Sequence, residues 1–161
     1  MRTYILVAAL LAAAPAHAQE ADACDQFKWP LARERALLAQ ASPGQSGDAM
    51  PLESAVKLAL LPAAEAKLPL APARVPKDGS FAGFVRLDKP SAGGTWRVTL
   101  TANAWIEVVQ DGKLLPVKDF SGVTGCDGLR KSVKFELTAQ PFVVEIAGAP
   151  SSGIGVAVTQ D

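Results

Sequence analysis

Residues 94–113 have the sequence GTWRVTLTANAWIEVVQDGK, and this stretch decides the fold class. Apolar residues occupy every second position in two runs, Trp96-Val98-Leu100 and Ala104-Ile106-Val108. This period of two is typical of strands that bury one face. Asp111-Gly112 follows, and an Asp-Gly pair between β-rich runs predicts a type I′ hairpin turn, because that turn needs positive φ at both central residues.

The same alternation extends outward along most of the chain. It predicts further strands at residues 54–60, 65–70, 81–87, 113–117, 133–137, 142–146 and 154–158. The composition of residues 52–61 also suits a helix, so strand and helix both remain open there. Eight or nine short strands, with turns between them, predict an all-β, antiparallel two-sheet sandwich of jelly-roll or immunoglobulin-like type.

One short helix is predicted at the front of the chain, over residues 27–40. Pro30 suits a first helical turn, and Phe27, Leu31 and Leu38 can share one face. Trp29 is expected to pack this helix onto the sheet. Residues 41–50 are rich in Ser, Pro and Gly and predict an exposed loop. The domain organisation expected is therefore residues 19–50 as helix and loop and residues 51–161 as the sandwich.

The first 18 residues predict a secretory signal peptide. Arg2 precedes an apolar run, and Ala16-His17-Ala18 has the small-x-small pattern of a cleavage site. The apolar run is shorter than the roughly 20 residues that cross a bilayer. We expect cleavage after Ala18, no membrane span afterwards, and a location in the bacterial periplasm or outside the cell.

Composition excludes several function classes for the expected mature chain. Loss of residues 1–18 removes Arg2 and leaves a net charge of about −1, which does not favour a nucleic-acid partner. It also removes His17, the only histidine. Without imidazole the chain cannot supply a Ser-His-Asp or Cys-His mechanism, or histidine ligands to zinc or iron.

Cys24 and Cys126 are the only cysteines, and they lie roughly 100 positions apart. In an oxidising compartment an isolated pair predicts a disulfide. A redox or metal-binding role is less favoured, because there is no C-x-x-C motif and no partner ligand.

Five segments in the second half carry a resemblance to a known family. They are FAGFVRL at 81–87, GTWRVTL at 94–100, AWIEV at 104–108, VKFEL at 133–137 and VVEI at 143–146. Together they resemble the bacterial pre-peptidase C-terminal type of β-sandwich. The resemblance implies a secreted accessory module without catalysis, in some members linked to carbohydrate or calcium.

The whole chain also resembles a group of uncharacterised exported proteobacterial proteins. The matching segments are CDQFKWP at 24–30, AWI at 104–106, and Ser121, Gly122 and Cys126 ahead of RKSV at 130–133. Some members of that group carry a homogentisate dioxygenase name. This chain departs from such chemistry, because those iron enzymes need histidine ligands and none remain after residue 18.

Trp105 and Glu107 are the first candidate ligand-binding residues. They share the strand face opposite Ala104, Ile106 and Val108. An exposed Trp beside a carboxylate would suit a sugar-stacking platform. The alternative, which we favour, is that Trp105 is covered by the helix or the opposite sheet, while Trp96 is expected in the core.

Residues 119–130 form the second candidate, a predicted glycine-bearing loop near Cys126. Its oxygen-bearing side chains suggest a calcium site, although the spacing matches no EF-hand loop and a solvated turn is favoured. Its side chains considered for ligand binding are Asp119, Ser121, Thr124, Asp127 and Arg130.

The sequence thus predicts a non-catalytic exported module that binds an envelope saccharide, calcium or a protein partner, with no cofactor required. Two alternatives remain open. One is an enzyme using scattered carboxylates such as Glu107, Asp119 and Glu136. The other is an inhibitor or interaction protein. Neither the ligand nor the oligomeric state follows from the sequence.

Overall fold

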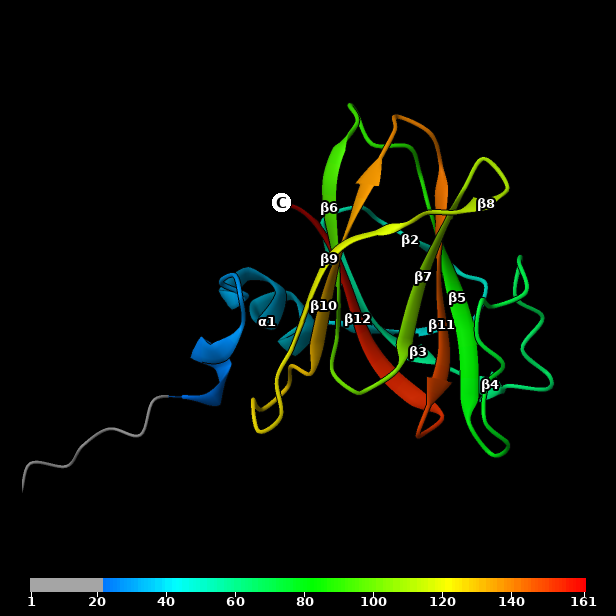
Figure 1. The fold of residues 1–161 in the computed structure, drawn as a ribbon, viewed down its shortest axis with the longest axis horizontal. Helices are drawn as coiled ribbons and strands as arrows, with labels where there is room; N and C mark the ends of the chain where they lie inside the picture. Colours follow the sequence, from blue (N-terminus) through cyan, green and yellow to red (C-terminus); the bar gives the residue numbers. More distant parts are fainter. Residues whose placement is uncertain (1–21) are drawn as a thin grey trace, which may run out of the picture.

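The computed structural model describes residues 22–161, and the predicted signal peptide lies outside this part of the chain. Two six-stranded sheets pack face to face, as the alternation of apolar residues predicts (Figure 1). The first sheet has the order β1-β3-β12-β6-β10-β9. The second has the order β2-β5-β11-β7-β8, with β4 paired to β5. No helix within residues 22–161 has the length and apolar character needed to span a membrane.

The elements of the first sheet are β1 (Ser42–Gln45), β3 (Ser54–Ala59), β12 (Gly153–Gln160), β6 (Gly94–Leu100), β10 (Lys131–Leu137) and β9 (Val117–Gly122). Those of the second sheet are β2 (Ala49–Met50), β5 (Phe81–Leu87), β11 (Phe142–Ala149), β7 (Trp105–Gln110), β8 (Lys113–Leu114) and β4 (Leu61–Pro62). A 3₁₀ turn, η1 (Ala23–Gln26), and one helix, α1 (Ala32–Ala39), precede them.

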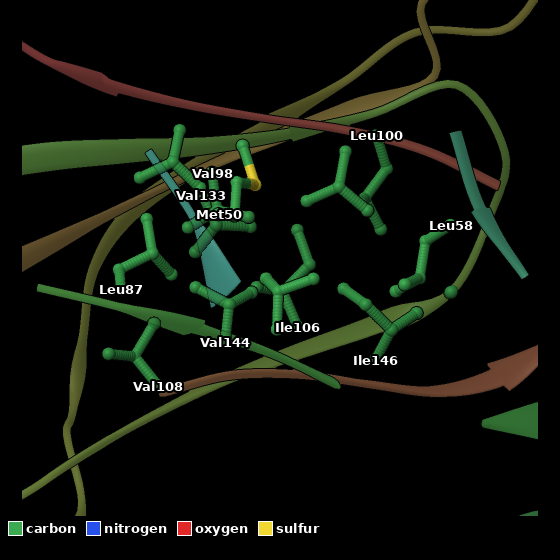
Figure 2. Packing of buried hydrophobic residues seen from close by; sticks show 14 of the residues in the cluster. Met50, Leu58, Leu87, Val98, Leu100, Ile106, Val108, Val133, Val144 and Ile146 are labelled. Atoms are coloured by element: carbon green, nitrogen blue, oxygen red, sulfur yellow. The ribbon is translucent and has the colours of Figure 1, made fainter. Parts of the chain in front are cut away.

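The main core fills the space between the sheets. Inward side chains of the first sheet, such as Val98 and Leu100, meet those of the second, such as Ile106 and Val144 (Figure 2). Trp96 belongs to this core and is 4% exposed, as predicted. Each strand delivers alternate residues to this space because successive side chains point to opposite faces.

The stretch that decides the fold divides between the two sheets. β6 lies in the first sheet and β7 in the second, so the short link over residues 101–104 crosses from one layer to the other. The predicted hairpin is confirmed, since β7 pairs antiparallel with β8 around Asp111 and Gly112. Both turn residues have positive φ, 52° and 71°, as a type I′ turn requires.

A second apolar cluster holds α1 against the outer face of the first sheet. Phe27, Leu31 and Leu38 are buried there with Leu129, and the Trp29 indole N–H donates to Ser132 Oγ at 3.2 Å. Figure 1 shows α1 on the side away from the second sheet. The helix is shorter than predicted, because Phe27 adopts extended backbone and residues preceding Pro30 are disfavoured from helical geometry.

Three local predictions are wrong. Residues 41–50 are not a loop: β1 pairs parallel with β3, and β2 pairs parallel with β5, so both sheets are mixed. Pro43 is tolerated because β1 is an edge strand, and a Cβ on Gly44 would lie 2.5 Å from Val56 Cγ2, so only glycine allows this approach. The sandwich therefore begins before residue 51. The strand alternative for residues 54–60 is confirmed over residues 54–59, which form β3.

The second error concerns residues 65–70, which form no strand. Pro62 and Pro69 lack the N–H that a ladder needs. Residues 63–80, the link between β4 and β5, instead run as an irregular segment that we call the strap. The third error concerns the loop predicted over residues 119–130, because its first four residues belong to β9, which ends at Gly122. The return strand predicted over residues 113–117 is also shorter, since β8 ends at Leu114.

Candidate functional site

The two sheets leave a groove between the edge strands β8 and β9, at the side of the sandwich opposite β1 and β2. Its volume is about 770 Å³, within the range of ligand sites. We call it the edge groove. Its lining includes Arg74, Trp105, Glu107, Val117, Lys118, Asp119, Phe120 and Lys131.

Strand pairing explains why the groove exists. β8 pairs only with Val109 and Gln110 of β7, so the first half of β7 has no strand beside it on this side. β9 is likewise bonded on one side only, to β10. Two strand edges therefore border the groove, below the point where residues 115–116 cross between the sheets.

Apolar side chains are exposed at the β9 border of the groove. Phe120 is 59% exposed and Val117 is 51% exposed. Lys28 Nζ lies 5.4 Å from the centre of the Phe120 ring and donates to Asp119 Oδ1 at 2.7 Å. The sequence did not single out Val117 and Phe120, because exposure of an edge strand depends on the neighbour it lacks.

Cationic groups occupy the other parts of the wall. Lys131 is half-buried and its Nζ donates to the Ala104 carbonyl at 3.1 Å. Burial lowers the pKa of Lys131, and the nearby charges of Arg74 and Arg130 act in the same direction. Among the ion pairs of residues 22–161, neither Arg74 nor Lys131 has a carboxylate within 4 Å.

Trp105 lies half-buried on the outer face of the second sheet, with neighbours of its ring on β11 and on the strap. A Cβ on Gly148 of β11 would lie 3.4 Å from the ring. The guanidinium of Arg74, a residue of the strap, lies 5.6 Å from the ring centre. The covering elements are therefore β11 and the strap, not the helix or the opposite sheet. These neighbours occupy part of the ring surface that a stacked sugar would need.

Among the predicted ligand-binding residues, the groove brings together Trp105, Glu107 and Asp119. Asp127 and Arg130 lie elsewhere: the Asp127 carbonyl accepts from Arg35 at 3.3 Å, and Arg130 Nη1 donates to the Val123 carbonyl at 3.3 Å. Nowhere in residues 22–161 do three or more His, Cys, Asp or Glu side chains gather as a metal centre would require. The geometry thus does not assemble the calcium site considered from sequence.

The predicted disulfide is confirmed. Cys24 and Cys126 are bonded, with their Cα atoms 4.7 Å apart, and the bond ties η1 to the loop after β9. Arg35 of α1 donates to both sulfur atoms. The bond is compatible with an extracytoplasmic location.

Two of the carboxylates considered for catalysis are held ionised by lysines. The Lys28 ammonium lowers the pKa of Asp119, and the Lys118 ammonium, 2.6 Å from Glu136 Oε2, lowers the pKa of Glu136. A general acid needs the opposite shift. Neither residue therefore suits the role of proton donor in glycoside hydrolysis.

Comparison with protein-family models, curated proteins and solved structures finds no match for this chain. The resemblance to the pre-peptidase C-terminal β-sandwich therefore stays a prediction.

Proposed function

We propose that this protein is a non-catalytic binding module of the bacterial envelope, exported by residues 1–18, and that the edge groove binds an extended segment of a partner protein. The observation that carries the proposal is the exposure of Val117 and Phe120 on an edge strand facing the unpaired half of β7. A partner segment could contact both borders at once.

The backbone chemistry of strand edges supports an extended ligand. An unpaired strand edge presents N–H and C=O groups that an added strand can bond, and pockets beside it select alternate side chains. Proteins usually protect such edges with charged or proline residues. β9 carries the charged residues Lys118 and Asp119 but also exposes two apolar residues, Val117 and Phe120. Fully burying an exposed valine side chain contributes roughly 1.5–3 kcal/mol.

The charge of the groove indicates the composition of the segment. Within residues 22–161, Arg74 and Lys131 are cations without a carboxylate partner, whereas Lys118 and Asp119 each form an ion pair. An acidic side chain in the segment would complement the two unpaired cations. The proposed partner therefore alternates apolar and acidic residues.

Two observations favour this ligand over the alternatives. The Trp105 ring is half-buried, with β11 and Arg74 of the strap beside it, which disfavours a saccharide platform. The lowered pKa values of Asp119 and Glu136 disfavour either residue as the general acid of a glycosidase.

The test uses two synthetic hexapeptides with blocked ends, one alternating valine with glutamate and the other alternating valine with lysine. Titration calorimetry with the oxidised protein should show tighter binding of the acidic peptide. Val117→Ser should weaken that binding about tenfold or more, because 1.4 kcal/mol corresponds to a factor of ten. Phe120→Ser should act in the same direction.

The matched control is Val75→Ser, since Val75 is 90% exposed but lies on the strap outside the groove lining. It should leave peptide binding unchanged. Equal binding of the two peptides, or equal loss in the Val75 and Val117 variants, would contradict the proposal.

A further inference from the structure

Two glutamates face each other on the outer surface of the second sheet. Glu107 of β7 is the direct cross-strand partner of Glu145 of β11. Glu145 is 1% exposed, because the strap covers this surface. Like charges placed directly opposite each other across strands destabilise a sheet. The pairing therefore requires something that offsets the repulsion.

The strap binds the two carboxylates in the same manner. The Leu70 N–H donates to Glu145 Oε1 at 2.8 Å, and the Ala73 N–H donates to Glu107 Oε1 at 2.9 Å. The second oxygen of each side chain, Oε2, is buried without a hydrogen-bond partner. An unpaired buried carboxylate oxygen is costly, so a donor is missing at one oxygen of each of these two cross-strand partners.

The surrounding cations do not supply that donor. The charged residues on the elements around the pair are Glu65, Lys67, Arg74, Lys77 and Asp78 of the strap, Arg86 of β5, Lys113 of β8 and Lys131 of the groove. Within residues 22–161 none of the basic ones lies within 4 Å of either glutamate.

We propose that Glu107 and Glu145 share one proton between their Oε2 atoms, and that this proton keeps the strap on the sheet. A single O–H from one carboxyl group to the other satisfies both unpartnered oxygens and removes one of the two charges, as in other close carboxylate pairs. Calcium suits the site less well, because it takes six to eight oxygen ligands.

The direction of the pKa agrees with this assignment. Burial raises the pKa of Glu145, and the charge of Glu107 acts in the same direction, while the Leu70 N–H opposes both. A carboxyl group with a raised pKa stabilises the folded arrangement fully at low pH and loses that contribution as pH rises through the raised value. The strap is therefore held at mildly acidic pH and loosens above the raised pKa.

Loosening would change the edge groove, because Ala73 and Arg74 of the strap line it and Arg74 covers Trp105. The shared proton thus makes the width of the groove depend on pH. This inference does not depend on the identity of the groove ligand, and its test uses no peptide.

The experiment follows the carboxyl carbon signals of Glu107 and Glu145 by NMR during a pH titration of the oxidised protein. We expect coupled titration in two steps, the upper one above the ordinary glutamate range. Amide exchange at Leu70 and Ala73, corrected for intrinsic rates, should slow as pH falls through the upper step. Ordinary, independent titration of both side chains would overturn the proposal.

Glu145→Gln provides the matched variant, because its amide N–H replaces the shared proton as a donor to Glu107. The corrected amide exchange rate at Ala73 should become independent of pH in this variant. The control is Glu136→Gln, which replaces an exposed carboxylate of the first sheet and should leave the pH dependence of exchange at Ala73 as in the wild type. Glu107→Gln serves as a second variant if the first fails to fold. Loss of the upper step on addition of calcium would identify a cation site and also overturn the shared proton.

Discussion

Arg97 Nη1 lies 3.2 Å from Glu34 Oε1 in the layer between α1 and the first sheet, where Glu34 is 1% exposed. The same oxygen accepts the Thr159 hydroxyl at 2.6 Å, and Arg97 Nε lies 3.1 Å from Asp161 Oδ1. Helix, central strands and C-terminus therefore meet at one buried ion pair.

Removing one partner of this pair should destabilise the protein strongly. Glu34→Ala leaves the partly buried Arg97 with Asp161 as its remaining carboxylate partner, so we expect a loss of about 3 kcal/mol in the free energy of unfolding, the lower end for a broken buried pair. Urea unfolding at pH 7 measures it. Glu136→Ala, which removes a carboxylate from an exposed pair, is the control and should change the midpoint little. Similar midpoints for both variants would show that the buried pair contributes little.

Reduction of the disulfide should lower stability without abolishing the sandwich. The bond closes a loop with a separation of 102 residues, for which the chain-entropy model gives about 4–5 kcal/mol. Thermal unfolding of the Cys24→Ser, Cys126→Ser double variant, compared with the oxidised protein, measures the effect. An unchanged melting temperature would mean that the second apolar cluster alone fixes η1 and α1.

Glycines on β12 should differ sharply in their tolerance of a methyl group. A Cβ on Gly155 would lie 2.5 Å from Thr101 Cγ2 and 3.0 Å from Leu38 Cδ2, so Gly155→Ala should cost about 1–3 kcal/mol. Gly153 has no atom within 4 Å of its Cβ position, so Gly153→Ala is the control and should be near neutral. Equal unfolding midpoints would indicate that α1 moves away at little cost.

Tryptophan substitutions should separate the core from the strap. Trp96→Ala should destabilise by about 3–5 kcal/mol, because Trp96 fills the main core against Phe142. Trp105→Ala should cost less, since Trp105 is half-buried, and should speed amide exchange in the strap. Faster exchange throughout the sandwich in the Trp105 variant would show that this residue supports the fold as a whole.

The strand pattern of the second half was predictable because every second residue there is apolar, as in β6, β7 and β10. The same rule failed at β1 and β2, whose Pro43 and Gly44 are poor strand formers. These strands exist because a sheet edge accepts them, which is tertiary information. It failed again in the strap, where alternation occurs but Pro69 and Pro72 lack the N–H that a ladder needs.

The candidate site was predictable only in part. Trp105 and Glu107 share a face because strand geometry is regular, and the groove contains both. The pairing of Glu107 with Glu145 depends on the register between β7 and β11, which one sequence does not specify. The same holds for the exposure of Phe120, which depends on where β8 ends.

The chain crosses directly between the two sheets on both sides of the sandwich, through residues 46–48 between β1 and β2 and through residues 115–116 between β8 and β9. These two connections, one on each side, are covalent ties that oppose sliding of one sheet over the other. Opening of the edge groove would then involve the stretch of β7 and β9 below the second tie. A ligand that binds there would be accommodated by movement of side chains and of the strap. The two sheets behind the groove would keep their alignment.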